Sequence, residues 1–449
     1  MKNILSKIDI AIRFFLYLLI FWLPYSKAVV ESSVIAAFVL WMLKKIIAAC
    51  ASGKFDSLSR LSVKDFVLLF KPPPSFLNGL IGIFLTFALV SALTGVSPRV
   101  SVYGLFTKTC EWFLIYFLMI EVFTEKKYVY RALYVFVFTS LATVLDSLSQ
   151  FYWTHKDIFL GYVMSDNRAT AGFNHANNLA GYLTFVVPVT ISLFWRSNKK
   201  WKTLLGILGA LLSIWSLGLT FSRGAWLATA AGILFFLFLT RSPRWDFISL
   251  GIILVIIACG IFLTIPGKEM RLEHSSIINM VNYRENLWED SWRMILNRPS
   301  FGYGPNTFMS EFFDFGRALR GTYAYTPTYA HNCFIQLAAE EGLIGLAVFL
   351  GIMGQLFIKV TERLKITKKN PTENKRLQLL SAGILSGTLA FLLHSFVDTN
   401  LFSLQLSALL WFMVGLQIAI YHLQFHKKDE TETLRLKPIH VSINKGSYA

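Results

Sequence analysis

The sequence has few charged residues and few cysteines for its length. Charged side chains make up 15% of the 449 residues, against about 25% in a typical soluble domain. Hydrophobic residues make up 55%. This balance excludes a soluble enzyme and a disordered chain. The four cysteines are scattered without metal-ligand spacing, which argues against a disulfide framework. The mean hydropathy of +0.53 indicates a membrane protein instead.

Sequence motifs for nucleotides and metals are missing as well. The chain has no Gly-x-x-x-x-Gly-Lys-Ser/Thr loop to hold phosphates. The predicted outer loops contain no Asp-x-Asp pair, and zinc ligands are absent at the usual spacings. We therefore expect a protein that uses neither a metal ion nor a cofactor.

Apolar runs long enough to cross a bilayer recur along the chain. They predict about twelve transmembrane helices, near residues 11–26, 31–43, 75–94, 103–123, 131–151, 174–195, 203–221, 224–240, 247–265, 334–358, 379–397 and 403–422. The fold class expected is an all-α polytopic membrane protein. Residues 1–265 hold helices 1–9, residues 266–333 form one long polar loop, residues 334–422 hold helices 10–12, and residues 423–449 form a tail.

The placement of the basic residues predicts the orientation. With the N-terminus inside, 30 of the 43 Lys and Arg residues fall on the inner side, and Lys and Arg concentrate in cytoplasmic loops. Both termini are therefore expected in the cytoplasm, and the 266–333 loop on the outer side. The net charge of +17 is spread over helix ends, where it suits anionic membrane lipids rather than nucleic acid.

Polar residues gather at the outer ends of the predicted helices, although polar groups at membrane depth are costly. One cluster, around residues 168–181, contains Arg168, His175 and Asn177. A second, between predicted helices seven and eight, contains Arg223. Asn and His at a helix start often serve only as caps. Capping explains Arg168 and His175 less easily. For Arg223 the simple alternative is snorkelling to the outer headgroups, but arginines are sparse on the outer side of a membrane.

The long outer loop and the helices after it carry the remaining clusters. Arg284 and Trp288 lie on a predicted amphipathic helix whose apolar spacing suits a membrane surface. A further group runs from His331 and Asn332 to Glu340, where the loop enters predicted helix ten. His394 lies four residues before Asp398, and the pair equally suits a satisfied intramembrane hydrogen bond.

These side chains suit one kind of chemistry. Arginine binds phosphate oxygens in two-point geometry, and histidine is the usual general base near neutral pH. Outer arginines beside a histidine suit a substrate with a diphosphate head and a lipid tail. The arginines would stabilise the leaving diphosphate, and His331 would take the proton of an acceptor hydroxyl.

At these residues the sequence resembles the O-antigen ligase and polymerase superfamily of bacterial polytopic glycosyltransferases. The resemblance covers about residues 168–415. It rests on Gly172 to Ala180, Ser222-Arg223-Gly224-Ala225, Arg284-x-x-x-Trp288 with Pro299 to Gly304, His331-Asn332 leading to Glu340-x-Gly342-x-x-Gly345, His394-x-x-x-Asp398, and Trp411 to Gly415.

The resemblance implies a GT-C-like helical protein of the bacterial inner membrane with a large periplasmic loop between helices 9 and 10. It implies an active site on the periplasmic side, where a glycan passes with inversion from undecaprenyl diphosphate to a hydroxyl of the lipid A–core. Carried over by position, Arg223 and Arg284 would contact the diphosphate, and His331 would be the base. Substrate binding is expected from Arg168, His175, Asn177, Trp288, Asn332, Glu340 and His394.

Two other functions stay open. A polymerase that joins lipid-linked repeat units uses similar motifs, but a single long outer loop late in the chain favours a ligase. A transporter would place polar residues at mid-membrane and show paired half-repeats. The polar residues here lie at the outer surface instead, which makes a transporter the weaker hypothesis.

Overall fold

The computed structural model describes residues 2–51, 70–164, 167–195, 199–241, 243, 274–312, 329–369 and 375–433. Within these ranges the ordered elements are helices, and the one strand-like feature is an isolated bridge between Lys156 and Val163. The predicted all-α class is therefore confirmed for the part of the chain that the structure describes.

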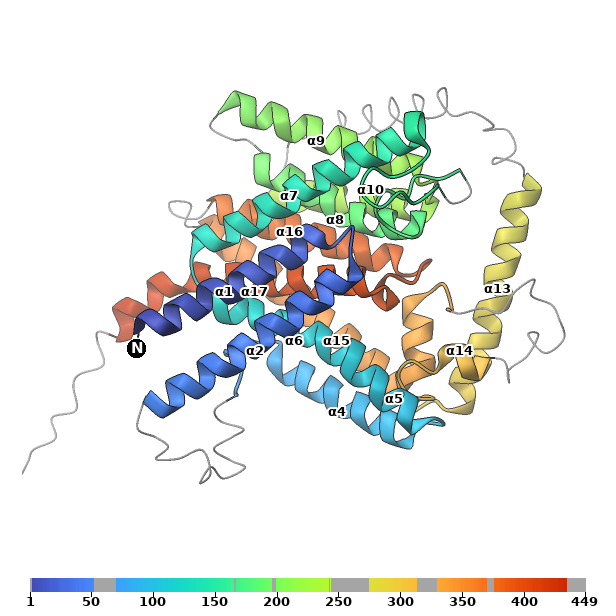
Figure 1. Cartoon of the computed structure of the whole chain (residues 1–449), viewed down its shortest axis with the longest axis horizontal. Helices are drawn as coiled ribbons and strands as arrows, with labels where there is room; N and C mark the ends of the chain where they lie inside the picture. Colours follow the sequence, from blue (N-terminus) through green and yellow to red (C-terminus); the bar gives the residue numbers. More distant parts are fainter. Residues whose placement is uncertain are drawn as a thin grey trace, which may run out of the picture.

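The elements carry the labels of Figure 1. In chain order they are α1 (Lys2–Trp22), α2 (Lys27–Ala51), α4 (Asn78–Thr94), α5 (Pro98–Gly104), the π-helix η2 (Leu105–Thr109), α6 (Cys110–Val122), α7 (Lys126–Ser149), the π-helix η3 (Gln150–Thr154), α8 (Ala176–Phe194), α9 (Lys200–Leu219), α10 (Arg223–Thr240), α13 (His274–Asn297), α14 (Phe308–Glu311), α15 (Cys333–Lys369), α16 (Lys375–His394), the 3-10 turn η6 (Asn400–Phe402) and α17 (Leu404–Thr433).

Eight of the described helices are long and apolar enough to cross a membrane, by length and composition. They are α2, α7 with η3, α8, α9, α10, α15, α16 and α17; α4 is apolar but has only 17 residues. This supports a polytopic membrane protein. The count of about twelve spans and the orientation stay predictions, and the predicted span 247–265 lies outside the described residues.

Helices α8, α16 and α17 form the centre of the bundle. Helix α16 packs along both α8 and α10, and α17 packs along α6. Tyr182 of α8 and Trp411 of α17 are completely buried. The peripheral helix α9 instead directs Leu204, Leu205 and Leu208 outward, each at least 50% exposed. An apolar outer face of this kind suits contact with lipid rather than water.

Helix α2 is longer than the apolar run 31–43 predicts, because its lysines are paired. The ammonium of Lys44 lies 2.7 Å from Asp9 Oδ1 and 2.9 Å from Glu121 Oε1, and Lys45 lies 3.1 Å from Glu121 Oε2. These ion pairs compensate the charges, so the helix continues past the two lysines to Ala51.

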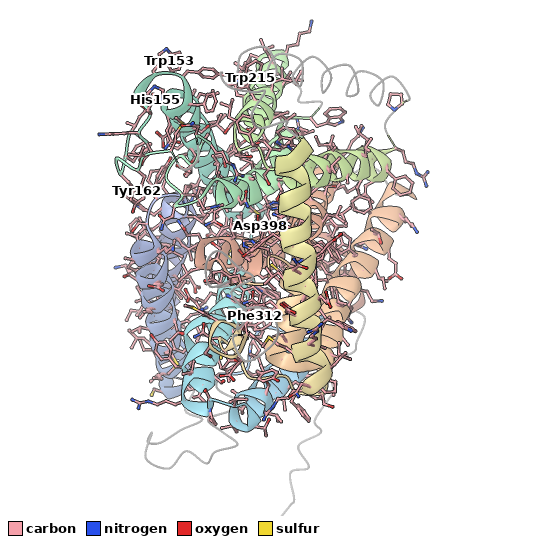
Figure 2. The ribbon with its side chains drawn as sticks, turned by 90° about the vertical axis from the view of Figure 1, so that its right-hand side faces the viewer. Trp153, His155, Tyr162, Trp215, Phe312 and Asp398 are labelled. Carbon is pink, nitrogen blue, oxygen red and sulfur yellow. The ribbon has the colours of Figure 1, made fainter. Side chains whose placement is uncertain are left out.

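The two ends of the bundle differ (Figure 1). The first residues of α1 and the last of α17 lie at one end, whereas α13 stands across the other end, roughly at right angles to the main bundle. We call this second end the α13 end; Figure 2 views it face on, with α13 in front. The residues singled out from the sequence belong to segments that meet there.

Candidate active site

The amphipathic helix expected in the long loop is α13, and its apolar face is used inside the protein. Leu287 and Ile295 are buried in a small core with Phe308 and Ala338, whereas Trp292 and Leu296 are 49% and 63% exposed. Helix α13 thus packs against the first turns of α15. The apolar stripe is divided between this packing and the outer surface, so a placement on the membrane surface stays a prediction.

The loop after α13 is locked onto α15 at a break in that helix. Gly342 has φ +76°, a conformation that L residues rarely adopt. A Cβ built on it would lie 2.2 Å from Ser300 O, so only glycine admits the loop this closely. The break frees backbone groups for the loop: Tyr303 N donates to Ala339 O at 3.0 Å, and Leu343 N donates to Pro299 O at 2.7 Å.

Glu340 completes this lock. Its Oε2 accepts from Asn306 N at 2.9 Å, and its Oε1 accepts from Phe308 N at 3.2 Å and from Gln336 Nε2 at 3.2 Å. Its carbonyl accepts from Ser91 Oγ and from Gly304 N. Glu340 is 5% exposed. These contacts hold the loop to the bundle; a substrate-binding role for Glu340 stays a prediction.

His331 lies just before α15 and is held through its neighbours. Asn332 caps the helix, since its Oδ1 accepts from Phe334 N and Ile335 N at 3.0 and 3.1 Å. On the other side, Trp288 Nε1 of α13 donates to Ala330 O at 3.0 Å. The backbone on both sides of His331 is therefore fixed, and Trp288 and Asn332 make contacts that position it.

The imidazole of His331 makes no hydrogen bond to any described residue, and its Nδ1 is buried from solvent. Buried polar atoms without a partner are rare in native proteins and call for an explanation. Its backbone φ is +48°, and a non-glycine residue held in this region indicates local strain that surrounding contacts maintain. His331 is thus held in place without a partner for its ring.

Charged groups from three motifs surround this imidazole. Burial lowers the pKa of His331 below its ordinary value of 6.5, Arg284 and His175 lower it further, and the carboxylate of Asp398 opposes them. The ring is therefore neutral at pH 7 and free to accept a proton. The structure brings together His175 from the start of α8, Arg284 from α13, and Asp398 from the turn after α16.

His394 is completely buried and fully bonded. Its Nδ1 lies 3.0 Å from Asn400 Nδ2, which can only donate, so its Nε2 carries the hydrogen and donates to Ser222 Oγ at 3.2 Å. Asp398 Oδ2 lies 3.9 Å from the same nitrogen. The hydrogen bond expected between His394 and Asp398 is not formed at this distance, and His394 instead bonds Ser222, the residue that precedes Arg223. A direct role in binding substrate stays a prediction.

Arg168, Asn177 and His175 connect the start of α8 to the turn before α10. Arg168 Nε donates to Thr220 O at 2.6 Å, and its guanidinium also donates to Asn177 Oδ1. His175 caps α8, with its Nδ1 accepting from Asn177 N at 3.2 Å. Capping, which the sequence favoured for Asn174 and Asn177 over His175, is thus the role of His175, and Arg168 and Asn177 support the turn that carries Arg223.

The two arginines expected at the diphosphate lie differently. Arg223 is exposed and begins α10, two residues after Phe221, whose φ is +53°. A helix start carries free backbone N–H groups and positive potential, which adds to the charge of the arginine. Arg284 is half-buried on α13 and interacts electrostatically with both His331 and His394. Within the described residues, no group of three His, Cys, Asp or Glu side chains is placed to hold a metal ion.

Sequence reasoning missed several residues that build this site. Ser222 and Asn400 lie inside or beside the quoted motifs, so their polarity was the available signal. Gln150 carried no such sequence signal. It is buried in η3, where its Oε1 accepts from Thr170 N and Ala171 N, each at 2.9 Å. This amide fixes the chain that leads to His175, and such a contact across about 20 residues has no local signature.

Residues 208–350 match the family model described as O-antigen ligase. The match includes Arg223, Arg284, Trp288, His331 and Glu340, whereas Arg168, His175, Asn177 and His394 lie outside it. The similarity to the O-antigen ligase and polymerase superfamily is thereby confirmed. A search of curated proteins found no match.

Proposed function

We propose that this protein is a bacterial inner-membrane O-antigen ligase. It transfers a polysaccharide from undecaprenyl diphosphate to a hydroxyl of the lipid A–core, at the α13 end on the periplasmic side. The observation that carries the proposal is the imidazole of His331, whose buried Nδ1 has no hydrogen-bond partner among the described residues and which interacts electrostatically with Arg284. The match to the O-antigen ligase family supports the same reaction class.

In the proposed reaction His331 is the general base. A histidine with a lowered pKa is unprotonated at neutral pH, so it can remove the proton of the acceptor hydroxyl as that oxygen attacks the anomeric carbon. The bond from that carbon to the diphosphate breaks in the same displacement, which inverts the configuration. Asp398, which acts electrostatically on His331, stabilises the imidazolium that forms.

The leaving diphosphate is the second requirement. Negative charge grows on it in the transition state, and positioned cations stabilise that charge most effectively where water is excluded. Arg223 and Arg284 supply two cations from different elements, and the start of α10 adds its backbone N–H groups. Four further predicted residues position these groups through backbone contacts. Arg168 and Asn177 hold the turn at Thr220, and Trp288 and Asn332 hold the residues beside His331.

A reconstituted transfer assay tests the proposal. Purified protein in liposomes is given an undecaprenyl-diphosphate glycan with and without lipid A–core, and the products are separated by size. Glycan on lipid A–core is expected, with no effect of chelators. Longer lipid-linked glycan in the absence of the acceptor would identify a polymerase instead. Folded protein that forms neither product from several donors would contradict both and return transport to consideration.

A further inference from the structure

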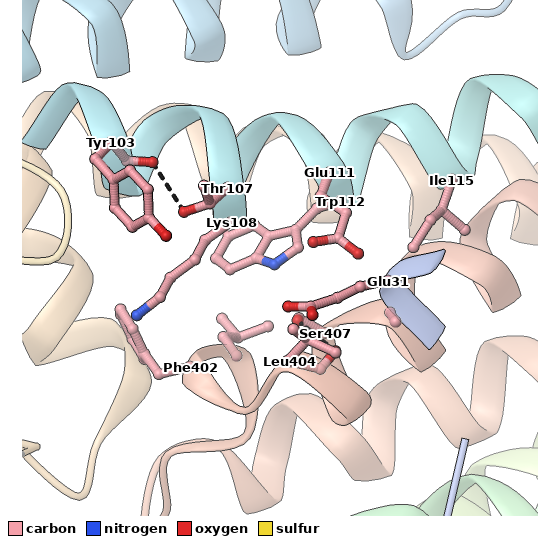
Figure 3. A pocket seen from close by; sticks show the side chains of 12 residues that line it. Glu31, Tyr103, Thr107, Lys108, Glu111, Trp112, Ile115, Phe402, Leu404 and Ser407 are labelled. Atoms are coloured by element: carbon pink, nitrogen blue, oxygen red, sulfur yellow. Dashed lines mark hydrogen bonds between the residues drawn. The ribbon is translucent and has the colours of Figure 1, made fainter. Parts of the chain in front are cut away.

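A cavity of about 200 Å³ lies beside the candidate active site and plays no part in the mechanism above. It is an open hollow lined by α2, by α5 with η2 and α6, and by the turn η6 with the start of α17. Its walls mix charged, hydroxyl and aromatic side chains (Figure 3). They are Glu31, Tyr103, Thr107, Lys108, Glu111, Trp112, Ile115, Leu401, Phe402, Leu404, Ser407 and Ala408.

The cavity shares its walls with the active site. Asn400 of η6 bonds His394 on one side, and the next two residues of η6 line the cavity on the other. The ring of Phe402 lies 6.4 Å from that of Tyr329, two residues before His331. Lys108 Nζ donates to Asn306 Oδ1 at 2.5 Å, which ties the cavity to the loop held by Glu340. A group bound in the cavity would therefore sit next to the reacting centre.

Two carboxyl groups of the cavity, those of Glu31 and Glu111, make no ion pair or side-chain hydrogen bond to a described residue. The Oε1 atom of Glu111 is buried and has no hydrogen-bond partner in the described part of the chain. Glu31 and Glu111 act on each other electrostatically, and no ion pair to a described residue compensates either one. Figure 3 shows both carboxylates facing the same space as the indole of Trp112, while Lys108 extends away from them. A carboxylate offers several acceptor sites and no donor, so it suits a ligand rich in hydroxyl groups.

The wall that carries these groups is a helix with a local defect. Helix α5 passes into the π-helix η2 before α6 begins, and η2 places Thr107 and Lys108 at the cavity. Short π-helical segments inside α-helices are rare and occur mainly at functional sites. The π-helix thus lies between the α5 residue and the α6 residues that also line the cavity.

We propose that this cavity binds one sugar ring of the acceptor glycan through its hydroxyl groups. The inference rests on the proposed function, since it gives the acceptor a subsite next to His331. Glu111 and Glu31 accept hydroxyl hydrogens through their carboxyl oxygens, and the tyrosine, threonine and serine side chains add further hydrogen bonds. The indole of Trp112 offers an apolar surface for the ring. The volume lies below the roughly 300–1,000 Å³ of sites for drug-sized molecules, so it suits a single ring rather than a longer glycan.

The test is a comparison of Glu111→Gln with the matched control Glu362→Gln, an exposed glutamate on α15. Acceptor KM and donor KM are measured in the transfer assay, and binding of deacylated core oligosaccharide is measured on protein in detergent by calorimetry. We expect Glu111→Gln to raise the acceptor KM and the oligosaccharide Kd by roughly tenfold, the loss of one hydrogen bond. The donor KM and the control should not change.

A second variant covers the case in which Glu111→Gln fails to fold. Tyr103 is 68% exposed at the cavity, so Tyr103→Leu removes a hydroxyl and a ring with little effect on stability; a weaker, several-fold rise in acceptor KM and Kd is expected. Unchanged acceptor KM and Kd in both variants would overturn the sugar subsite. Because the calorimetric binding does not require turnover, it also separates a failed subsite from a failed transfer reaction.

Discussion

The two polar regions at the start of α15 look alike in sequence but differ in their bonding. Both carboxylate oxygens of Glu340 accept hydrogen bonds. Two of these bonds come from the backbone N–H groups of Asn306 and Phe308. At His331, nine residues earlier, the ring has no described hydrogen-bond partner and its Nδ1 is buried. The comparison shows two kinds of polar residue in this bundle. Some, like Glu340, bond the backbone and fix its position; others, like His331, are positioned by that backbone while their side chain stays available to a substrate.

The largest expected effect comes from His331. We expect His331→Gln to lower kcat by roughly 10²–10⁴-fold, the contribution of a positioned general base, because glutamine cannot take up the proton. Thermal unfolding in detergent should stay unchanged, since the ring makes no hydrogen bond to a described residue. A variant with near-normal kcat would place His331 with Glu340 among the structural residues.

The arginines at the diphosphate come next. We expect Arg284→Ala and Arg223→Ala each to reduce transfer by roughly 10²–10³-fold, because a cation on the developing charge is lost. Arg168→Ala serves as the comparison, since its guanidinium bonds the protein at Thr220 O and Asn177 Oδ1. It should lower the unfolding temperature as well as activity. Equal losses of stability in all three variants would contradict the distinction between arginines that bind the diphosphate and an arginine that holds the fold.

Glu340 tests the other side of the comparison. Glu340→Gln places an amide where two backbone N–H groups donate, so at least one of them loses its acceptor. We expect unfolding to become easier by about 1–3 kcal/mol, measured by denaturant titration in detergent, and Glu362→Gln to match the wild type. A Glu340→Gln protein as stable as the wild type but unable to transfer glycan would make Glu340 a substrate residue after all.

The smallest expected effect is a shift of the pH profile. The carboxylate of Asp398 raises the pKa of His331 against burial and Arg284, so Asp398→Asn lowers that pKa. Because the neutral imidazole is the active form, the acid limb of kcat/KM should move to lower pH in this variant. A limb that moves to higher pH would show that another group controls it.

The sequence was informative where the physics is local. Apolar runs predicted helices such as α8 and α16, the periodicity around Leu287 predicted α13, and the polar start of α8 allowed the cap that His175 forms. It could not reveal contacts between distant segments. Ser222 meets His394 across 172 residues, and Ser91 meets the carbonyl of Glu340 across 249.

The roles of the site residues likewise depend on contacts between distant segments, which the sequence could not reveal. His331 and Glu340 share the sequence features of a polar residue beside or inside an apolar run, and only their partners separate them. Glu340 bonds α4 and the 304–308 segment directly, whereas α13 and the turn after α16 bond the backbone of Ala330 and Cys333, on either side of His331. Lys44 shows how the sequence misplaced a helix end. The predicted span stopped before this lysine, but Asp9 and Glu121 neutralise it within a longer helix.

The most direct test of the central claim, that His331 is a neutral base, is the pH dependence of transfer in the wild type and in His331→Gln. The wild type should lose kcat/KM toward acid with a midpoint below 6.5, the ordinary pKa of histidine, and the residual activity of His331→Gln should lack that limb. The same acid limb in both proteins would show that His331 is not the titrating base and would contradict the account.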